Sequence, residues 1–595
     1  MVVEVKRLGL FVFYDRDGIV DDYVIYLLND LMENLDDLVV ISNSDLNKNE
    51  KKKFTKFTNN IIIRENKGLD AGALCEYFNV HEEYKKYDEV VYLNDTFFGP
   101  LYPFKKVFEK MDAKKDLDFW GLSLGHITPD GYHIYEDKII HDHLQSFFIV
   151  FRKKLVNSDV FKNYWRNYDI EKMLSFYDVV TKHELTFTKY LSDNGFKYDS
   201  YVVDSYYGIE PSRNFNNYFH NSSTQVIIDK APFFKRKMFA TDQGTMLYMT
   251  DSNDLRKVMN YIETKTDYDT NLIWKNLLRL YNLHQLSISY GFNEIVEVTK
   301  EEKNKKNVHG IVMLNNIFFV EEVKKREKLF TKIDILTTRK DIVDKGQACN
   351  LDIILIEEKD VKVIQNIIKD SKEEYVCFLN FVEQKDRIIL IDAVENQTTL
   401  DNLLVSEKYF NSLIEQMQKN NISMAYAPEN NHYDDFYKNL FWKENVYTKI
   451  EEIMPEYKML NRDQYPVSFN TNFIVKKEVL KHLDFMKWPQ MNESDFWQVL
   501  AISLAYYGTF DGLRPMIAYE KNYFVYKMNN LECITKGTYR TLYKNNQMPV
   551  TYAEAIKYIA NLQSKVTFKH KIKMYVLNHF YYPIRNRVRK LRKKD

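Results

Sequence analysis

Short apolar runs alternate with polar turns and amphipathic stretches through the first part of the chain. Arg7–Tyr14 is typical of a strand, residues 20–31 show helical spacing, and Leu38–Ile41 begins the pattern again. A third apolar run, Asn60–Ile63, precedes the turn RENKGLDAGA and another helical stretch. Repeated strand-then-helix units of this kind predict an α/β fold with a parallel sheet and right-handed crossovers.

The stretch YDEVVYLNDTFFGP contains a buried strand that ends abruptly in polar residues. Val90–Leu93 are apolar or aromatic, and Asn94 and Asp95 follow them directly. Open α/β sheets bind ligands at the carboxyl ends of their strands, so Asp95 is placed to ligate a hard cation that bridges two phosphates. The alternative is that the strand is followed by an Asx turn that caps a helix beginning near Tyr102.

Glycines and polar residues mark the turn that follows the third strand. Asn66, Gly68, Asp70 and Gly72 lie there, where glycine permits close backbone approach and Asp70 is able to accept a hydrogen bond from a ribose or a base. The alternative role of Asp70 is to cap the helix that runs through Tyr77. No GxxxxGK[ST] motif is present and no GxGxxG follows the first strand, so ATPase and dinucleotide-binding functions are disfavoured.

Two later segments add polar side chains to the same predicted edge of the sheet. In HDHLQSFFIVF, Gln145 and Ser146 precede an apolar strand and would lie over the site. In TKHELTFTKYLSDNGF, helical spacing places Glu184 in the first turn of a helix. A Glu at that position commonly stabilises the helix dipole, which is the structural alternative to a catalytic role.

Several short motifs follow one another along the chain: Ser-Asn after the second strand, Asn-x-Gly-x-Asp, YLNDTFFGP, DFWG, HLQSFFIVF and HELTFTKYL. In this order they resemble the rhamnan synthesis protein F family over about residues 5–240. That family is similar to GT-A-fold glycosyltransferases related to glycosyltransferase family two. The resemblance implies sugar transfer from a nucleotide sugar, dTDP-rhamnose or a UDP-sugar, to a lipid-linked glycan acceptor of a cell-surface polysaccharide. It also implies Mg²⁺ or Mn²⁺ as a cofactor.

The resemblance implies roles for individual residues. Glu184 stands where related enzymes place the catalytic base, and Asp95 stands at the metal and diphosphate motif, which is Asn-Asp-Thr here rather than a doubled Asp. The implied chemistry is a single displacement at the anomeric carbon. The acceptor region is expected at Gln145, Ser146 and His143, and the donor-binding positions are Tyr14, Ser42, Asn43, Asn66, Asp70, Asn94 and Asp95.

The pattern of the first half recurs after the charge run at residues 301–307. GIVMLNNIFFVEEV parallels GLFVFYDRDGIVDDYV, IDILTT parallels LVVISN, YVCFLN parallels EVVYLN, and FIVKK, aligned on its Phe, parallels FIVFRK. Four matches in the same order predict a second GT-A-like domain. Phe381 stands at the position of Asp95, so this domain lacks the metal carboxylate, although Glu493 or Asp495 remains a candidate base for a second activity.

A chain of 595 residues is too long for one hydrophobic core. The patterns divide it into four parts. We expect an α/β protein with a catalytic GT-A domain at residues 1–250, a helical connector at 251–307, a second GT-A-like domain at 308–545 and a basic helical tail at 546–595.

The charge of the chain is concentrated at its end. Lys569–Asp595 contains 10 Lys or Arg and one acidic residue, whereas the whole chain has a net charge of zero. This basic tail predicts binding to an anionic membrane surface, with RNA or no ligand as alternatives, and we expect no nucleic acid partner. Its apolar residues recur at helical spacing, at Ile572, Val576, Phe580, Ile584, Val588 and Leu591.

Cysteine usage and hydropathy bear on location and on the alternatives. The four cysteines form no CxxC pair, and no apolar run approaches the ~18 residues of a membrane span. We therefore expect a cytoplasmic protein, peripheral on the inner face of the membrane. The alternative function is a non-catalytic sugar-nucleotide or glycan-binding scaffold. A nucleotidyltransferase would need a second acidic metal ligand, which the sequence does not place.

Overall fold

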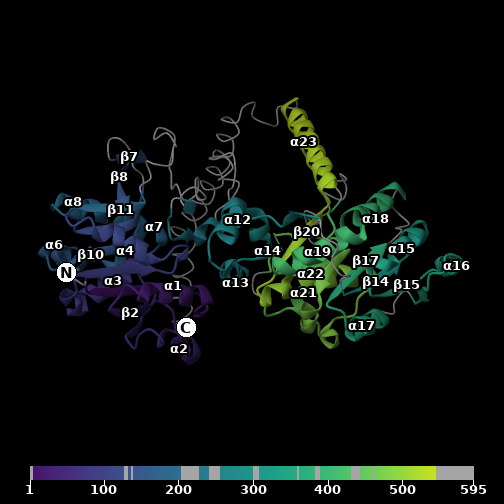
Figure 1. Cartoon of the computed structure of the whole chain (residues 1–595), viewed down its shortest axis with the longest axis horizontal. Helices are drawn as coiled ribbons and strands as arrows, with labels where there is room; N and C mark the ends of the chain where they lie inside the picture. The colour runs from purple at the N-terminus through teal and green to yellow at the C-terminus, as the bar shows by residue number, and fades with distance from the viewer. Residues whose placement is uncertain are drawn as a thin grey trace, which may run out of the picture. The chain divides into compact units, whose positions relative to one another are not determined.

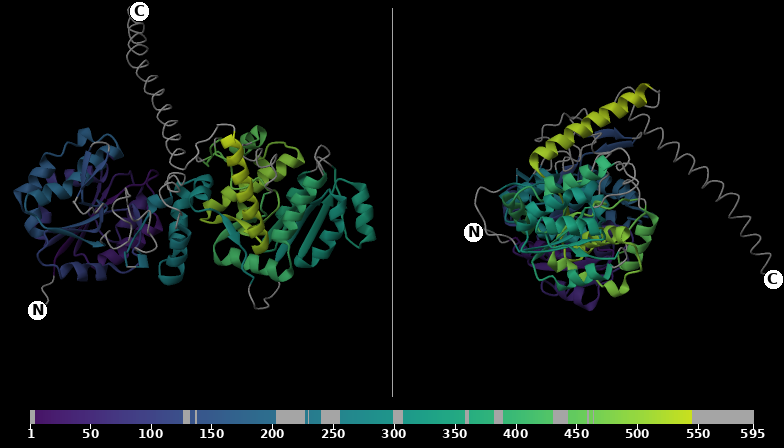
Figure 2. Two further views of the ribbon diagram at one scale, coloured as in Figure 1. Left: turned by 90° about the horizontal axis from the view of Figure 1, so that it is seen from above. Right: turned by 90° about the vertical axis from the view of Figure 1, so that its right-hand side faces the viewer.

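The computed structural model describes residues 5–125, 132–135, 138–202, 227–228, 230–239, 255–298, 307–357, 361–381, 389–429, 443–457, 460–462 and 464–544. The chain divides into a unit Met1–Ala518 and a unit Tyr519–Asp595. In the described part of the first unit, two large sheets each combine parallel and antiparallel pairs and are covered by helices (Figures 1 and 2). The predicted α/β class is confirmed.

The first sheet begins with the predicted strand-then-helix units. β1 pairs in parallel with β2 and β4, and β2 pairs in parallel with β3. The strands are β1 Arg7–Phe13, β2 Asp37–Ser42, β3 Ile61–Ile63, β4 Glu89–Asn94, β6 Phe119–Gly125, β10 Phe148–Arg152 and β11 Tyr198–Val202. The helices are α1 Asp22–Met32, α2 Lys48–Phe54, α3 Leu69–Val80, α4 Phe104–Asp112, α5 Lys153–Val156, α6 Asp159–Arg166, α7 Phe176–Val179 and α8 Leu185–Asp193.

Both faces of this sheet are buried, which explains the continuous apolar strands. Every residue of β1 is buried, and successive side chains point to opposite faces. Phe11 packs in one cluster with Leu27 of α1, whereas Leu10 packs in another with Leu74 of α3. Each fully buried side chain of this size stabilises the fold by roughly 1.5–3 kcal/mol.

One antiparallel strand brings distant segments to the same sheet edge. β10 runs antiparallel between β4 and β6, while β11 pairs in parallel with β6. Phe148 lies opposite Leu93, and the Asn94 amide donates to the Phe147 carbonyl at 3.0 Å. The residues before β10 therefore meet the residues after β4.

Helices α12 (Leu255–Lys265), α13 (Thr270–Leu280) and α14 (Leu283–Ser289) lie in the predicted connector. α13 packs against α1 and against α22 (Glu493–Phe510). Near the end of α13, Arg279 Nη2 donates to Asp15 Oδ2 at 2.5 Å and to Asp21 Oδ2 at 2.6 Å. These contacts fix the end of α13 beside the turn after β1.

The second sheet has the strand order β13-β20-β18-β19-β17-β14-β15-β16. From β20 to β16 this order and these strand directions match β11-β6-β10-β4-β1-β2-β3 of the first sheet. The register agrees as well: Val12 lies opposite Asn94, and Met313, the counterpart of Val12, lies opposite Asn380. Phe381 therefore occupies the place of Asp95.

The elements of this second sheet are close to the predicted runs. The strands are β13 Asn293–Ile295, β14 Val308–Leu314, β15 Lys332–Thr337, β16 Ile354–Leu355, β17 Tyr375–Phe381, β18 Ile422–Tyr426, β19 Phe473–Lys476 and β20 Arg514–Tyr519. The main helices are α15 Val320–Arg326, α16 Lys340–Ala348, α17 Val361–Asp370, α18 Ile389–Leu403, α19 Glu407–Lys419, α21 Glu444–Ile453 and α22.

One of the four sequence matches is shifted by a residue. The sequence aligns Phe473 with Phe148, but Phe473 lies opposite Phe378, whereas Ile149 lies opposite the equivalent Tyr92. Phe473 thus corresponds to Ile149. Short apolar runs match in several registers, and only the strand ladder selects one.

In the second unit the structure describes α23 (Lys521–Lys544, Figure 1). The predicted tail at 546–595 lies outside the described residues. Among the helices that the structure describes, none is long and apolar enough to cross a membrane.

Candidate functional site

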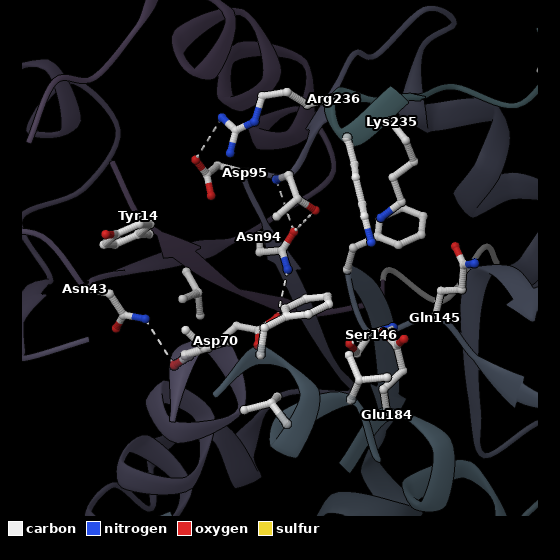
Figure 3. A pocket seen from close by; sticks show the side chains of 18 of the residues that line it. Tyr14, Asn43, Asp70, Asn94, Asp95, Gln145, Ser146, Glu184, Lys235 and Arg236 are labelled. Carbon is white, nitrogen blue, oxygen red and sulfur yellow. Dashed lines mark hydrogen bonds and ion pairs between the residues drawn. The ribbon is translucent and has the colours of Figure 1, made fainter. Parts of the chain in front are cut away.

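A cavity of about 370 Å³ opens at the carboxyl ends of the parallel strands of the first sheet (Figure 3). It is lined by Val12, Tyr14, Asn43, Asn66, Leu69, Asp70, Asn94, Asp95, Thr96, Gln145, Ser146, Phe147, Phe176, Val179, Val180, Glu184, Lys235, Arg236, Lys237 and Tyr281. Nearly all of the side chains predicted from sequence meet here.

Two predicted positions, Ser42 and His143, are not among the lining residues. The Ser42 hydroxyl donates to the Ser44 carbonyl at 2.7 Å and so holds the turn after β2. His143 is buried, and its Nδ1 lies 2.9 Å from the His141 carbonyl oxygen. It contributes to the cavity indirectly, because its attraction lowers the pKa of Glu184.

Asn43 organises the turns after β2 and β3. Its Nδ2 donates to Asn66 Oδ1 at 3.1 Å and to the Leu69 carbonyl at 3.0 Å. Its Oδ1 accepts from Arg64 at 2.7 Å. Gly68, at φ +70°, precedes α3 in the left-handed conformation that favours glycine. Asn43 and Asn66 thus fix the shape of this end of the cavity.

Asp70 lies inside the first turn of α3 and is not its cap, which is Gly68. The capping alternative is therefore wrong. The Asp70 carboxylate accepts from the Tyr92 hydroxyl at 2.6 Å and from Asn94 Nδ2 at 2.8 Å. It ties α3 to the end of β4, inside the cavity wall.

The residue that forms the turn after β4 is Asn94, not Asp95. Asn94 Oδ1 accepts from the Thr96 amide at 3.2 Å and from the Thr96 hydroxyl at 2.7 Å. The helix that follows begins at Phe104, beyond the expected start near Tyr102. An Asx turn therefore does follow the strand, but Asn94 forms it, and it does not cap the next helix, whose N-cap is Pro103. The Asp95 side chain is left to the cavity.

Asp95 is buried and faces a cation. Its Oδ2 accepts from the Tyr23 hydroxyl at 3.3 Å and lies 3.6 Å from Arg236 Nη1. Burial raises the pKa of Asp95 to about 6, against the opposing effects of Arg236 and Tyr23. At neutral pH the side chain is mainly ionised and forms an ion pair with Arg236.

Glu184 does not lie in a first helical turn. α7 precedes it, a π-helical turn spans Val180–Glu184, and α8 follows directly. A residue with helical turns on both sides gains little from a helix N-terminus, so the helix-dipole interpretation is wrong. Single π-helical turns inside α-helices frequently occur at functional sites.

Ser146 holds the Glu184 carboxylate in the cavity. The Ser146 amide and hydroxyl both donate to Glu184 Oε2, at 3.0 and 2.6 Å. Burial disfavours ionisation of Glu184, but attraction to His143 and the two Ser146 hydrogen bonds outweigh it and set its pKa below the usual value. Glu184 is therefore a carboxylate at neutral pH, able to accept a proton.

The sequence prediction missed a basic segment that reaches the cavity from far along the chain. β12 (Phe234–Lys235) pairs antiparallel with β5 (Phe97–Phe98), which follows Asp95. The Arg236 amide also donates to the Thr96 carbonyl at 3.3 Å. The available signal was the run FFKRK, an apolar pair followed by three cations. Tyr281, which follows α13, was missed as well.

The predicted Mg²⁺ or Mn²⁺ site at Asp95 can be tested against these side chains. Within the described residues, no group of three or more His, Cys, Asp or Glu side chains is arranged to hold a metal ion. The Asp95 carboxylate already faces the Arg236 guanidinium and accepts from Tyr23. A second cation beside Arg236 would be repelled, so these residues do not fit a divalent ion.

The fold and the cavity together define an α/β protein with a ligand-sized cavity at the carboxyl ends of its parallel strands. The model of one family, rhamnan synthesis protein F, matches residues 38–496. The chain belongs to this family, as the sequence motifs predict. No curated protein matches the chain.

The chain shows a distant likeness to several solved structures. The glycosyltransferase GlyE of Streptococcus pneumoniae TIGR4 is 12% identical, with 66% of this chain and 90% of GlyE covered and a TM-score of 0.24. Glucosyl-3-phosphoglycerate synthase of Mycobacterium tuberculosis, solved with Mn²⁺, UDP-glucose and phosphoglyceric acid, is 9% identical. The match covers 25% of this chain and 58% of the synthase, with a TM-score of 0.18. CMP:2-keto-3-deoxy-manno-octonic acid synthetase, solved with CTP, is 10% identical. The match covers 33% of this chain and 90% of the synthetase, with a TM-score of 0.22.

Proposed function

We propose that the protein is an inverting glycosyltransferase that moves rhamnose from a nucleoside-diphosphate sugar to a lipid-linked precursor of a cell-surface polysaccharide. The observation that carries this proposal is that one cavity contains both an ionised carboxylate, Glu184, and a cationic end formed by Lys235 and Arg236. Glycosyl transfer needs these two features on opposite sides of the reacting carbon. The choice of rhamnose comes from the name of the family.

In this proposal each bond change has a partner in the cavity. The acceptor hydroxyl oxygen attacks the anomeric carbon, and Glu184 takes the hydroxyl proton. The bond from that carbon to the diphosphate oxygen breaks, and Arg236 faces the negative charge that develops there. Asp95 positions Arg236 through the ion pair at 3.6 Å. Gln145 and Ser146, in the turn before β10, border the acceptor side.

We assign the nucleoside to the other end of the cavity. Tyr14, Asn43, Asn66 and Asp70 line that end, and in Figure 3 Tyr14 and Asn43 lie away from Glu184. An aromatic ring such as Tyr14 can stack on a base, while fixed amides and a carboxylate can bind its polar edge or the ribose. The donor is dTDP-rhamnose or a UDP-sugar in this proposal.

We also propose that residues 1–250 form the catalytic domain and residues 308–545 a second, non-catalytic GT-A-like domain. The matching strand orders support the duplication. Phe381 replaces Asp95, and Asp495, a candidate base, accepts from Lys449 at 2.6 Å and from Asn445 at 2.7 Å. Unlike Glu184, which is held by the neutral Ser146, Asp495 is committed to an ion pair with the Lys449 ammonium. The tail at 546–595 is proposed to hold the protein on the inner face of the membrane.

A panel of donors tests the function. Thermal shift with dTDP-, UDP- and GDP-sugars should give one nucleotide that stabilises the protein by RT ln(1 + [L]/Kd), and that donor should then support transfer to a glycan acceptor. Stabilisation without transfer to any acceptor would favour the scaffold alternative. A panel with no stabilising sugar nucleotide would contradict the proposal.

A further inference from the structure

Lys235 and Arg236, which the sequence did not predict at this site, form the cationic end of the cavity. Both are half-buried, and both reach the cavity because β12 pairs with β5. In Figure 3 they project into the cavity from the side that carries Asp95. Lys237, the third cation of the run, also lines the cavity and has its ammonium 5.2 Å from the Phe176 ring centroid.

Lys235 lacks a bonded anion within the residues that the structure describes. Its ammonium lies 3.3 Å from the Phe147 ring centroid, and its attractions to Glu184 and Asp70 include no hydrogen bond. A cation removed from water in this way is unfavourable unless an anion joins it. An anionic ligand would supply the hydrogen-bonded partner that Lys235 lacks among the described residues.

The charged groups around Lys235 have opposing effects on its pKa. The pKa of Lys235 is lowered to about 7, chiefly by burial and also by Arg236 and Lys237, against the opposing effects of Glu184 and Asp70. A bound anion would favour the protonated ammonium.

Arg236 is held ready for an anion by its neighbours. Its Nη1 donates to the Tyr23 hydroxyl at 2.8 Å and lies 3.6 Å from Asp95 Oδ2. The rest of the planar guanidinium fork can bind phosphate oxygens, and such bonds are strong because both partners are charged. A rigid cation and an adjacent ammonium match the two phosphates of a nucleoside diphosphate.

We propose that Lys235 and Arg236 bind the donor diphosphate directly and supply the positive charge that a divalent cation would supply, so that donor binding needs no metal. This inference rests on the proposed function, because it takes the ligand to be a nucleoside-diphosphate sugar. In this inference, Lys235 and Arg236 take the role that the sequence assigned to a metal ion at Asp95. Asp95 becomes the positioning residue of Arg236.

Titration calorimetry on the full chain tests this with three probes, UDP, dTDP and inorganic pyrophosphate, in EDTA and in Mn²⁺. We expect the affinities to agree within about threefold between EDTA and Mn²⁺. Lys235→Gln and Arg236→Gln should each weaken diphosphate binding roughly tenfold to hundredfold. The matched control is Lys197→Gln, which removes one charge from an exposed side chain outside the cavity. Circular dichroism and melting establish that each variant is folded.

The outcomes separate this inference from the proposed function. Binding that EDTA abolishes and Mn²⁺ restores would overturn the inference and leave the function standing. Parental affinity for UDP, dTDP and pyrophosphate in folded Lys235→Gln and Arg236→Gln would also overturn it. Pyrophosphate binding that Lys235→Gln weakens, without any binding of UDP or dTDP, would support the phosphate site and refute the nucleotide-sugar donor.

Discussion

Replacing Glu184 by Gln tests the base at the centre of the proposed reaction. The change keeps the length and planarity of the side chain, and the amide oxygen can still accept from the Ser146 amide and hydroxyl, which lie 3.0 and 2.6 Å from Glu184 Oε2. The fold and the cavity should therefore persist. What is lost is the ability to take the acceptor proton.

The expected magnitude follows from that single loss. General-base catalysis typically contributes ~10² to 10⁴ in rate, about 3 to 5.5 kcal/mol of transition-state free energy. The fall should appear in kcat, with the donor affinity unchanged, because Glu184 does not touch the diphosphate in the proposal. A radiolabelled or mass-spectrometric transfer assay and calorimetry with the donor measure the two quantities separately.

The matched control is Asp118→Asn, the same change of carboxylate to amide outside the cavity. Asp118 is buried, accepts from the Lys197 amide at 2.9 Å and pairs with Lys154 at 2.8 Å. It should affect stability more than transfer. If Glu184→Gln transferred sugar within about threefold of the parent, Glu184 would not be the base.

Three further predictions concern charge. Asp95→Asn should lower kcat/KM about tenfold to hundredfold by releasing Arg236, and Mn²⁺ should not restore it; restoration by Mn²⁺ would favour the metal site. Burial lowers the pKa of Lys235 to about 7, and a bound anion should raise it, so diphosphate affinity should fall as the pH rises above 7. Binding near pH 7 should take up a proton, and this uptake should disappear in Lys235→Gln. Deleting Lys569–Asp595 should release the protein from anionic liposomes in a sedimentation assay; equal pelleting of both chains would refute the membrane role.

The first sheet was predictable because its signals are local. Apolar runs with abrupt polar ends mark β1 to β4, and parallel crossovers then place Tyr14, Asn43 and Asp95 at one edge. Ser146 was also predictable, since it directly precedes an apolar strand. Residues at strand ends reach the site by the geometry of the sheet alone.

The rest of the site depends on contacts that no local pattern contains. Lys235 and Arg236 reach Asp95 only through the pairing of β12 with β5, more than a hundred residues apart in the sequence. The π-helical turn at Glu184 interrupts helical spacing and so hid the preceding helical turns. Tyr281 follows a helix that Arg279 fixes by long-range ion pairs.

The proposed loss of function in the second sheet gives the last prediction. Phe381 occupies the place of Asp95, is fully buried, and stacks on Phe319 with ring centroids 5.5 Å apart and 13° between planes. Phe381→Ala should cost about 3–5 kcal/mol of unfolding free energy because it leaves a cavity in the core. Diphosphate affinity at the first sheet should not change. Urea denaturation measures the stability and calorimetry the affinity.

The neighbouring Phe318 provides the control, because its side chain is 66% exposed. Phe318→Ala should change stability by less than about 0.5 kcal/mol. If Phe381→Ala left stability unaltered, the aromatic stack would have no structural role. If the folded variant instead lost nucleotide binding, the second sheet would take part in donor binding, and its assignment as a non-catalytic domain that supports the fold would be wrong. The proposal that a core side chain has replaced the carboxylate in the second sheet requires two results together. Phe381→Ala must lose stability where Phe318→Ala does not, and donor binding must stay intact.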